Sequence, residues 1–300
     1  MATEIPYVRD LTFEYGAVDQ VSPLIRRVIA ENPSPFTFHG TGTYIVGRGN
    51  VAVIDPGPLV DSHIDALERA VAGERVSHIV ITHTHRDHSP AARILKELTG
   101  APTYGFGPHG SGRPDHGGEV EEGADREFDP DVRVRDGERI EGDGWSLEAV
   151  HTPGHTSNHL CYSFAEENAF FSGDHVMGWS TTVVSPPDGD MQAYMRSLER
   201  LMARDEEVYW PTHGSAIPTP AKFVGALLAH RHEREDQIMA CLASGTSMIP
   251  AMVETMYVNV GRHLHAAAAR SVQSHLIHMV ETGRVHCDGP PGPGSTYQLP

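Results

Sequence analysis

The chain is poor in cysteine and has no long apolar run. Its three cysteines are widely spaced and form no CxxC pair, so a disulfide framework is not expected and a reducing, cytoplasmic setting is favoured. No apolar run reaches the roughly 18 residues that a membrane-spanning helix needs. The opening stretch, MATEIPYVRD, lacks the basic and apolar regions of a secretory signal. We therefore expect a globular chain with no membrane partner.

Positive charge is also scarce. The chain has 23 Lys+Arg against 40 Asp+Glu, which gives a formal net charge of -17. Residues 221–300 contain six basic and six acidic residues, so the whole acidic excess lies in residues 1–220. Polyanions are bound through clustered Lys and Arg. The composition therefore favours a small-molecule partner over nucleic acid, although a local basic groove could still form.

One short stretch concentrates groups that bind metals. THTHRDHS, residues 82–89, holds three histidines and an aspartate within six residues. The apolar stretch 78–82 before it is typical of a buried strand. Residues 89–100 after it begin with Ser-Pro and end with Gly, as helices commonly do. The cluster is either a polar loop in a histidine-rich chain or a metal site between a strand and a helix.

Other predicted strands are also followed by imidazole or carboxylate groups. HTPGH follows the strand predicted at 145–150, Asp174 follows 169–173, and PTH follows 206–210. A further strand is predicted at 159–164. If these strands are neighbours that point one way, the polar groups meet at one edge of a sheet. The candidate ligands are His83, His85, Asp87, His88, His155, Asp174 and His213.

Seven ligands are too many for one tetrahedral ion and suit two ions that share a carboxylate. Imidazole and carboxylate bind zinc, and also iron or manganese. Two such ions, about 3.5–4 Å apart, can share a hydroxide and polarise a substrate oxygen. We therefore expect two Zn²⁺ as cofactors, with Fe or Mn as alternatives.

The composition changes near residue 219. Helical patterns at 221–245, 248–259 and 263–283, followed by a possible short strand, predict a small unit of winged-helix type. The expected domains are a catalytic domain (1–218), a winged-helix-like domain (219–288) and a loose tail (289–300).

A glycine-rich stretch precedes the second half of the catalytic domain. Residues 105–118 hold six glycines, together with His109 and His116. This composition predicts a flexible loop. It is either a lid over the active site or a plain surface excursion.

The motifs together resemble a known family. HTHRDH is similar to the HxHxDH signature of the metallo-β-lactamase-fold hydrolases, and IDPG, TPGHT, FSGD and PTHG stand in that family's order. The resemblance covers about residues 38–216. It implies an α/β fold, an αββα sandwich. The C-terminal pattern resembles the subgroup around β-lactamase-like protein 2, in which a small winged-helix-like domain follows the sandwich, but SPPDGD after Val184 departs from that subgroup.

The family pattern also implies a role for each candidate ligand. His83, His85 and His155 would hold the first metal, and Asp87, His88 and His213 the second. Asp174 would bridge the two ions, and Asp55 would brace the ligand loop from behind. The bridging Asp174 disfavours antibiotic hydrolysis, because many true β-lactamases of this fold carry Cys there or lack the bridge. His85, where flavodiiron proteins have Glu, disfavours a redox role.

Three interpretations of the function remain open on this sequence. The first is an enzyme that uses a bridging hydroxide on a small ester, thioester or lactone, with Asp87 and Asp174 at the reacting centre. The alternative, which the resemblance to the subgroup around β-lactamase-like protein 2 implies, is a metal-dependent single-strand endoribonuclease; the acidic composition disfavours it. His159 either contacts the substrate or simply begins a strand. The C-terminal unit could also serve as a module for a homodimer or another partner.

Overall fold

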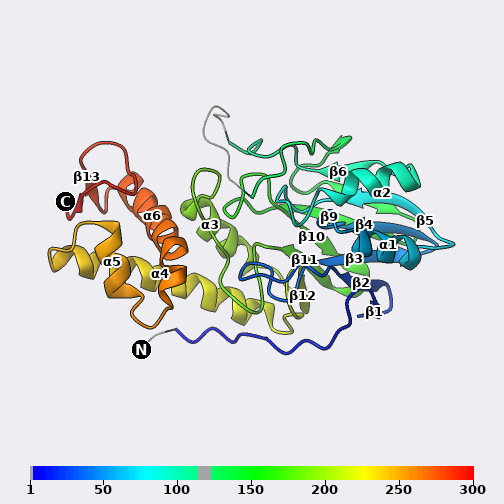
Figure 1. Cartoon of the computed structure of the whole chain (residues 1–300), viewed down its shortest axis with the longest axis horizontal. Helices are drawn as coiled ribbons and strands as arrows, with labels where there is room; N and C mark the ends of the chain where they lie inside the picture. The colour runs from blue at the N-terminus through cyan, green and yellow to red at the C-terminus, as the bar shows by residue number, and fades with distance from the viewer. Residues whose placement is uncertain (1–2, 114–122) are drawn as a thin grey trace.

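The computed structural model describes residues 3–113 and 123–300. Figure 1 shows two sheets packed face to face, helices against their outer faces, and a helical unit that contains the C-terminus. This arrangement confirms the predicted αββα sandwich and the separate helical unit after it. Part of the glycine-rich stretch, with His116, lies outside the described residues.

The first sheet contains seven strands in chain order. Neighbours from β1 to β4 run antiparallel, and those from β4 to β7 run parallel. Parallel neighbours require a crossover. Helices α1 (Asp61–Ala70) and α2 (Ala91–Thr99) provide it from β4 to β5 and from β5 to β6, on the outer face. The strands are β1 (Val18–Gln20), β2 (Ile25–Ile29), β3 (Gly42–Arg48), β4 (Asn50–Ile54), β5 (Arg75–Val80), β6 (Thr103–Gly105) and β7 (Val132–Arg133).

The second sheet has the strand order β12-β11-β10-β9-β8. Strands β11 and β12 pair in parallel, and helix α3 (Met191–Leu201) lies between them in the chain and covers the outer face; the other neighbours pair antiparallel. The carboxyl ends of β11 and β12 therefore meet at one edge. The strands are β8 (Arg139–Gly142), β9 (Trp145–His151), β10 (Leu160–Phe164), β11 (Ala169–Gly173) and β12 (Val208–Pro211), and a short 3-10 helix (Ala165–Glu167) precedes β11.

Alternation along the strands divides the apolar side chains between layers. Tyr44 and Ile54 of the first sheet meet Leu147 and Phe171 of the second, and these side chains fill the space between the sheets. Side chains of the opposite parity, such as Phe170, pack beneath α3 instead. Both sheets are thus buried on two faces, and polar groups remain where the strands end.

The C-terminal unit shares one helix with the sandwich. Helix α4 (Pro220–Ala243) places Phe223 and Leu227 in the layer beneath α3, and Ile238 and Leu242 in a separate C-terminal core. The predicted boundary before residue 219 therefore precedes a helix that belongs to both cores. The unit also contains α5 (Ile249–Met256), a 3-10 helix (Arg262–Leu264), α6 (His265–Glu281), β13 (His286–Cys287) and β14 (Tyr297–Gln298).

The tail differs from the loose segment predicted over residues 289–300. Strand β14 pairs with β13, and Tyr297 is fully buried in the C-terminal core. Its hydroxyl donates to the Gly292 carbonyl at 2.8 Å. Burial of one aromatic side chain outweighs the freedom that the Pro and Gly residues give this segment. None of the helices in the described part of the chain has the length and apolarity to cross a membrane.

Candidate metal centre

Four strands bring the candidate ligands to one edge of the sandwich. His83 to His88 follow β5, His155 follows β9, and Asp174 and His213 follow β11 and β12 directly. Their ligand atoms form three groups in which every atom lies within 4.8 Å of the others. The groups are His83, His85 and His155; His83, His88 and Asp174; and Asp87, His88 and His213. The structure thus brings together all seven ligands named from the sequence.

The first group consists of three converging imidazoles. The Nε2 atoms of His83 and His155 lie 2.9 and 3.0 Å from Nδ1 of His85. His155 Nδ1 must donate to the Val183 carbonyl at 2.6 Å, so the Nε2 of neutral His155 carries a lone pair. The hydroxyl of Thr82 donates to Asp55 and therefore accepts from His83 Nδ1 at 3.1 Å. His83 Nε2 thus also points a lone pair into the group.

The second group combines imidazoles with two carboxylates. His213 Nε2 lies 3.2 Å from Asp87 Oδ2 and 3.4 Å from Asp174 Oδ1. His88 Nε2 lies 3.6 Å from an oxygen of each of the same two carboxylates. His213 Nδ1 donates to the Gly40 carbonyl at 3.1 Å. In the neutral ring Nε2 is then a hydrogen-bond acceptor, and the carboxylate oxygens that it faces are acceptors as well. Asp174 touches both groups, because its Oδ2 is also 3.8 Å from His155 Nε2.

This arrangement fits a bound cation. Within the described part of the chain, His88 Nε2, His213 Nε2 and Asp174 Oδ1 are buried and have no hydrogen-bond partner. Buried polar atoms without partners are costly, and lone pairs that converge on one point are the donor set of a metal ion. Each of these histidines also uses its second nitrogen to donate to the protein, as metal-binding histidines do.

Electrostatics support the same conclusion. Burial lowers the pKa of His213, but the Asp174 and Asp87 carboxylates outweigh burial and raise that pKa to about 10. Burial raises the pKa of Asp174, yet His213 and His88 hold it well below its usual range. His88 and His213 likewise lower the pKa of Asp87 against the effect of burial, so both carboxylates remain ionised and require positive charge beside them. A proton on each histidine or a divalent cation between them can provide it.

Asp55 holds the ligand loop from behind. It is buried at the end of β4 and accepts from the Thr82 amide at 2.8 Å and from His88 Nδ1 at 2.9 Å. The hydroxyls of Thr82 and Thr212 donate to its Oδ2 at 2.7 and 3.1 Å. One carboxylate thus connects the loops after β5 and β12 and fixes the tautomer of His88. Its φ of 48° is unusual for a residue other than glycine.

The sequence did not indicate Thr82 and Thr212. Each threonine stands immediately before a ligand histidine, in THTH and PTH respectively. A hydroxyl next to a ligand can reach a shared carboxylate. This position next to a ligand histidine could have pointed to the two threonines, but only the structure shows that Asp55 lies within reach of both hydroxyls.

His159, for which the sequence left open a substrate contact or the start of a strand, stands immediately before β10. Its side chain is fully buried. Nδ1 lies 2.9 Å from the Thr152 hydroxyl, and Nε2 accepts from the Asp174 amide at 3.2 Å. Burial, together with neighbouring His175 and His155, holds its pKa well below the usual range. Since both nitrogens bond within the protein, His159 orients the backbone of Asp174 and is not placed to contact a substrate.

The described part of the glycine-rich stretch packs beside the ligands. Nδ2 of Asn158 donates to the carbonyls of Gly107 and Pro108 at 3.1 and 3.3 Å. A Cβ at Gly112 would stand 1.9 Å from the Ser157 carbonyl, so only glycine permits this approach. The His109 ring lies 6.1 Å from the ring of His85. Residues 105–113 therefore form part of the wall of the centre.

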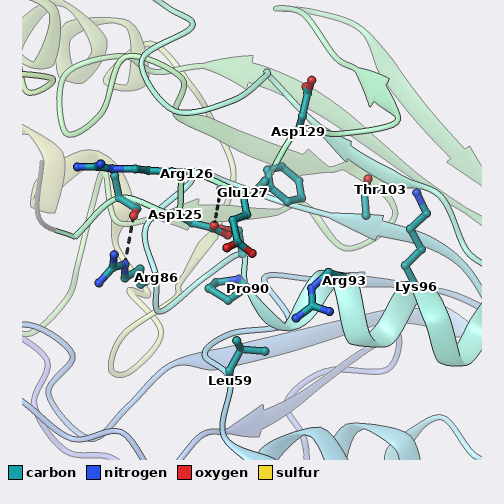
Figure 2. A pocket seen from close by; sticks show the side chains of 13 residues that line it. Leu59, Arg86, Pro90, Arg93, Lys96, Thr103, Asp125, Arg126, Glu127 and Asp129 are labelled. Carbon is teal, nitrogen blue, oxygen red and sulfur yellow. Dashed lines mark hydrogen bonds between the residues drawn. The ribbon is translucent and has the colours of Figure 1, made fainter. Parts of the chain in front are cut away.

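A cavity of about 570 Å³ lies behind the ligand loop. Figure 2 shows Arg86, Arg93 and Arg126 around it, together with Asp125 and Glu127. The seven ligands are absent from its lining. Its mixed charges select neither an anion nor a cation, and it is distinct from the site of the converging ligands.

Comparison with known proteins identifies the family. The description of the metallo-β-lactamase superfamily matches residues 37–213, and that of the β-lactamase-associated winged-helix domain matches residues 249–290. The chain therefore belongs to the metallo-β-lactamase superfamily and carries the winged-helix domain associated with it. This confirms the family that the sequence motifs resemble.

Two fungal relatives illustrate the similarity in sequence. The atrochrysone carboxyl ACP thioesterase AgnL7 of Paecilomyces divaricatus is 35% identical over 229 residues, which are 75% of this chain and 66% of that protein. The chain thus spans just under two thirds of that relative's length. The lactamase-like protein adaB of Aspergillus niger is 28% identical, covering 97% of this chain and 94% of the relative.

Two bacterial structures match over both parts of the chain. A β-lactamase domain protein from Burkholderia ambifaria superimposes with a TM-score of 0.78 at 19% identity, covering 97% of this chain and 96% of the other. A metallo-β-lactamase family protein from Thermus thermophilus gives 0.75 at 22% identity, covering 93% of this chain and 100% of the other. At these identities the matches establish the fold.

Proposed function

We propose that the protein is a dinuclear, metal-dependent hydrolase of carbonyl compounds, and that thioesters are its substrate class. The observation that carries this proposal is the convergence of five imidazoles and two carboxylates at one edge of the sandwich. The name of the thioesterase relative supports thioesters ahead of the esters and lactones that the sequence left open. Zn²⁺ is the proposed native ion, and Fe or Mn would fit the same ligands.

The ligand geometry supports one assignment of residues to the two ions. His83, His85 and His155 would hold the first, because their nitrogens converge at 2.9–3.0 Å. Asp87, His88 and His213 would hold the second, and Asp174, which touches both groups, would bridge them. When bound, the ions would lower the pKa of a water molecule toward neutrality and polarise a carbonyl oxygen.

The protein side chains have separate tasks around that centre. Asp55 orients His88, His159 holds the Asp174 backbone, and the Val183 carbonyl orients His155. Asp87 is 28% exposed and is the more accessible of the two ligand carboxylates. We assign the substrate to this open side, next to Asp87, because Asp174 is more enclosed.

Aromatic side chains beside His213 support an apolar acyl group in the substrate. The rings of Phe38 and Trp179 stack at 4.8 Å. Trp179 packs against Gly214, where an added Cβ would meet its ring at 3.0 Å. Phe36 is 55% exposed nearby in the chain. Phe38 has a φ of 58°, a strained conformation of the kind that clusters at ligand sites.

A panel of acyl thioesters and a labelled single-stranded RNA tests the proposed function. We expect the zinc-loaded protein to release free thiol from the thioesters and to leave the RNA intact. The acidic excess of residues 1–220 disfavours binding of the RNA backbone, and the cavity in Figure 2 mixes acidic with basic side chains. RNA cleavage without thioester hydrolysis would replace this proposal with the endoribonuclease.

Replacement of Trp179 by alanine tests the apolar surface. We expect Trp179→Ala to raise KM for a long-chain or aromatic acyl thioester about tenfold, equivalent to about 1.4 kcal/mol, because stacking area is lost. KM for an acetyl thioester should change much less. Trp179→Phe, which keeps a ring against Phe38, is the matched control. Equal effects on both thioesters would show that Trp179 does not contact the acyl group.

A further inference from the structure

We propose that Arg231 is a positioning residue through which helix α4 holds the wall of the metal centre. Arg231 lies outside both segments that the family descriptions match, residues 37–213 and 249–290. It is 3% exposed, and its Nη2 donates to the Thr182 carbonyl at 2.5 Å. The inference rests on the ligand roles proposed above for His155 and Asp174.

The segment that Arg231 holds contacts both of those ligands. The Thr182 hydroxyl bonds to the carbonyls of Asp174 and His175, at 2.7 and 3.0 Å. The next carbonyl, that of Val183, accepts from His155 Nδ1 at 2.6 Å. Two consecutive residues therefore fix the backbone of the bridging carboxylate and the ring of a first-metal ligand. A shift of this segment would move both ligands together.

Tyr194 links Arg231 to the backbone next to Asp174 through a second set of contacts. The Arg231 guanidinium lies over its ring at 5.0 Å. The Tyr194 hydroxyl donates to the His175 carbonyl at 3.1 Å, and its ring lies 4.6 Å from the His175 ring. A planar guanidinium can bond a carbonyl at its edge and cover a ring with its face, which an ammonium group cannot do equally well.

The C-terminal unit sets the position of α4 and therefore of Arg231. One turn after Arg231, Glu235 is buried and lies 3.5 Å from His275 Nδ1 and 3.2 Å from His278 Nδ1 of α6. Its other oxygen pairs with Arg284, just before β13. The winged-helix unit thus holds helix α4 in place. Through Arg231, this unit supports the segment Thr182–Val183 beside the metal centre.

Titration of the folded protein with Zn²⁺ against a chelator tests the proposal. We expect Arg231→Met to bind Zn²⁺ about 10- to 100-fold more weakly, the usual cost of removing a group that orients a metal ligand. Arg231→Lys, which can still donate to the carbonyl, should lie closer to the wild type. Lys222→Met removes the same charge from an exposed position on α4 and should bind normally. Arg231→Met with wild-type affinity would overturn the proposal.

If Arg231→Met does not fold, Thr182→Val tests the same route with Arg231 in place, and wild-type Zn²⁺ affinity in that variant would overturn the proposal. Thr182→Val removes the hydroxyl that bonds Asp174 and His175 while keeping the shape of the side chain. We expect about tenfold weaker Zn²⁺ binding, and no further loss when both changes are combined, because both act through one segment. If the two losses of Zn²⁺ affinity multiply in the double variant, Arg231 and Thr182 do not act through the same segment. Because Zn²⁺ binding is measured without a thioester, failure of the proposed reaction would remain distinguishable.

Discussion

Asp174→Ala is expected to abolish turnover and lower the metal content while leaving the fold largely intact. The carboxylate touches both ligand clusters, through His155 on one side and His88 and His213 on the other. Its loss should reduce kcat/KM below about one-thousandth, equivalent to about 4 kcal/mol of transition-state stabilisation. Metal analysis and thioester kinetics on the same preparation measure both effects.

Two comparisons make the Asp174 result specific. Asp205→Ala, at an exposed position before β12, removes the same charge far from the ligand groups in the fold and should behave as the wild type. Circular dichroism should show the same secondary structure for all three proteins. Full activity in Asp174→Ala would remove the bridging assignment, whatever the metal content.

Asp55→Asn is expected to lose the second ion and retain the first. The carboxylate accepts hydrogen bonds from Thr82, His88 and Thr212. An amide presents its NH₂ group to some of these donors, so His88 would lose the partner that keeps Nε2 free for a metal. Unsatisfied buried donors cost about 1–3 kcal/mol each, so the melting temperature should fall as well. Metal stoichiometry near one per chain, with kcat strongly reduced, is the predicted result.

Asparagine is the appropriate replacement because it removes the negative charge of Asp55 and changes little else. It has nearly the same shape as aspartate and tolerates the positive φ of 48° at this position. Asp65→Asn on the exposed side of α1 controls for the change in net charge. Two tightly bound ions in Asp55→Asn would show that the His88 tautomer does not depend on Asp55.

The seven candidate ligands could be named from the sequence because each follows a predicted strand. Short apolar runs marked β5, β9, β11 and β12, and the parallel ends of β11 and β12 bring Asp174 and His213 to the same edge as the HxHxDH loop. The rule that parallel strand ends meet at one edge applies to β11 and β12, which are parallel neighbours, but β5 belongs to the other sheet and β10 separates β9 from β11. How the four strand ends meet therefore depends on the packing of the two sheets, which the sequence did not specify.

The supporting contacts could not be predicted in the same way. The carbonyls of Val183 and Gly40, which orient His155 and His213, belong to groups that every residue carries. The sequence left open whether His159 contacts a substrate or begins a strand, because its burial depends on how β9 and β10 pack. Arg231 stands 49 positions after the carbonyl that it bonds. Contacts of this kind follow from tertiary packing, which a local pattern does not specify.

The burial of Tyr297 illustrates the same limit. Residues 289–294, GPPGPG, favour a loose chain. An aromatic residue three positions later can still reach an apolar core and order the segment that precedes it. Composition averaged over the tail obscured that single side chain.

X-ray diffraction from zinc-loaded crystals, recorded at the zinc absorption edge, tests the central claim most directly. We predict two anomalous peaks about 3.5–4 Å apart, one among His83, His85 and His155 and the other among Asp87, His88 and His213, with Asp174 between them. A single peak, or peaks away from these ligands, would contradict a dinuclear centre.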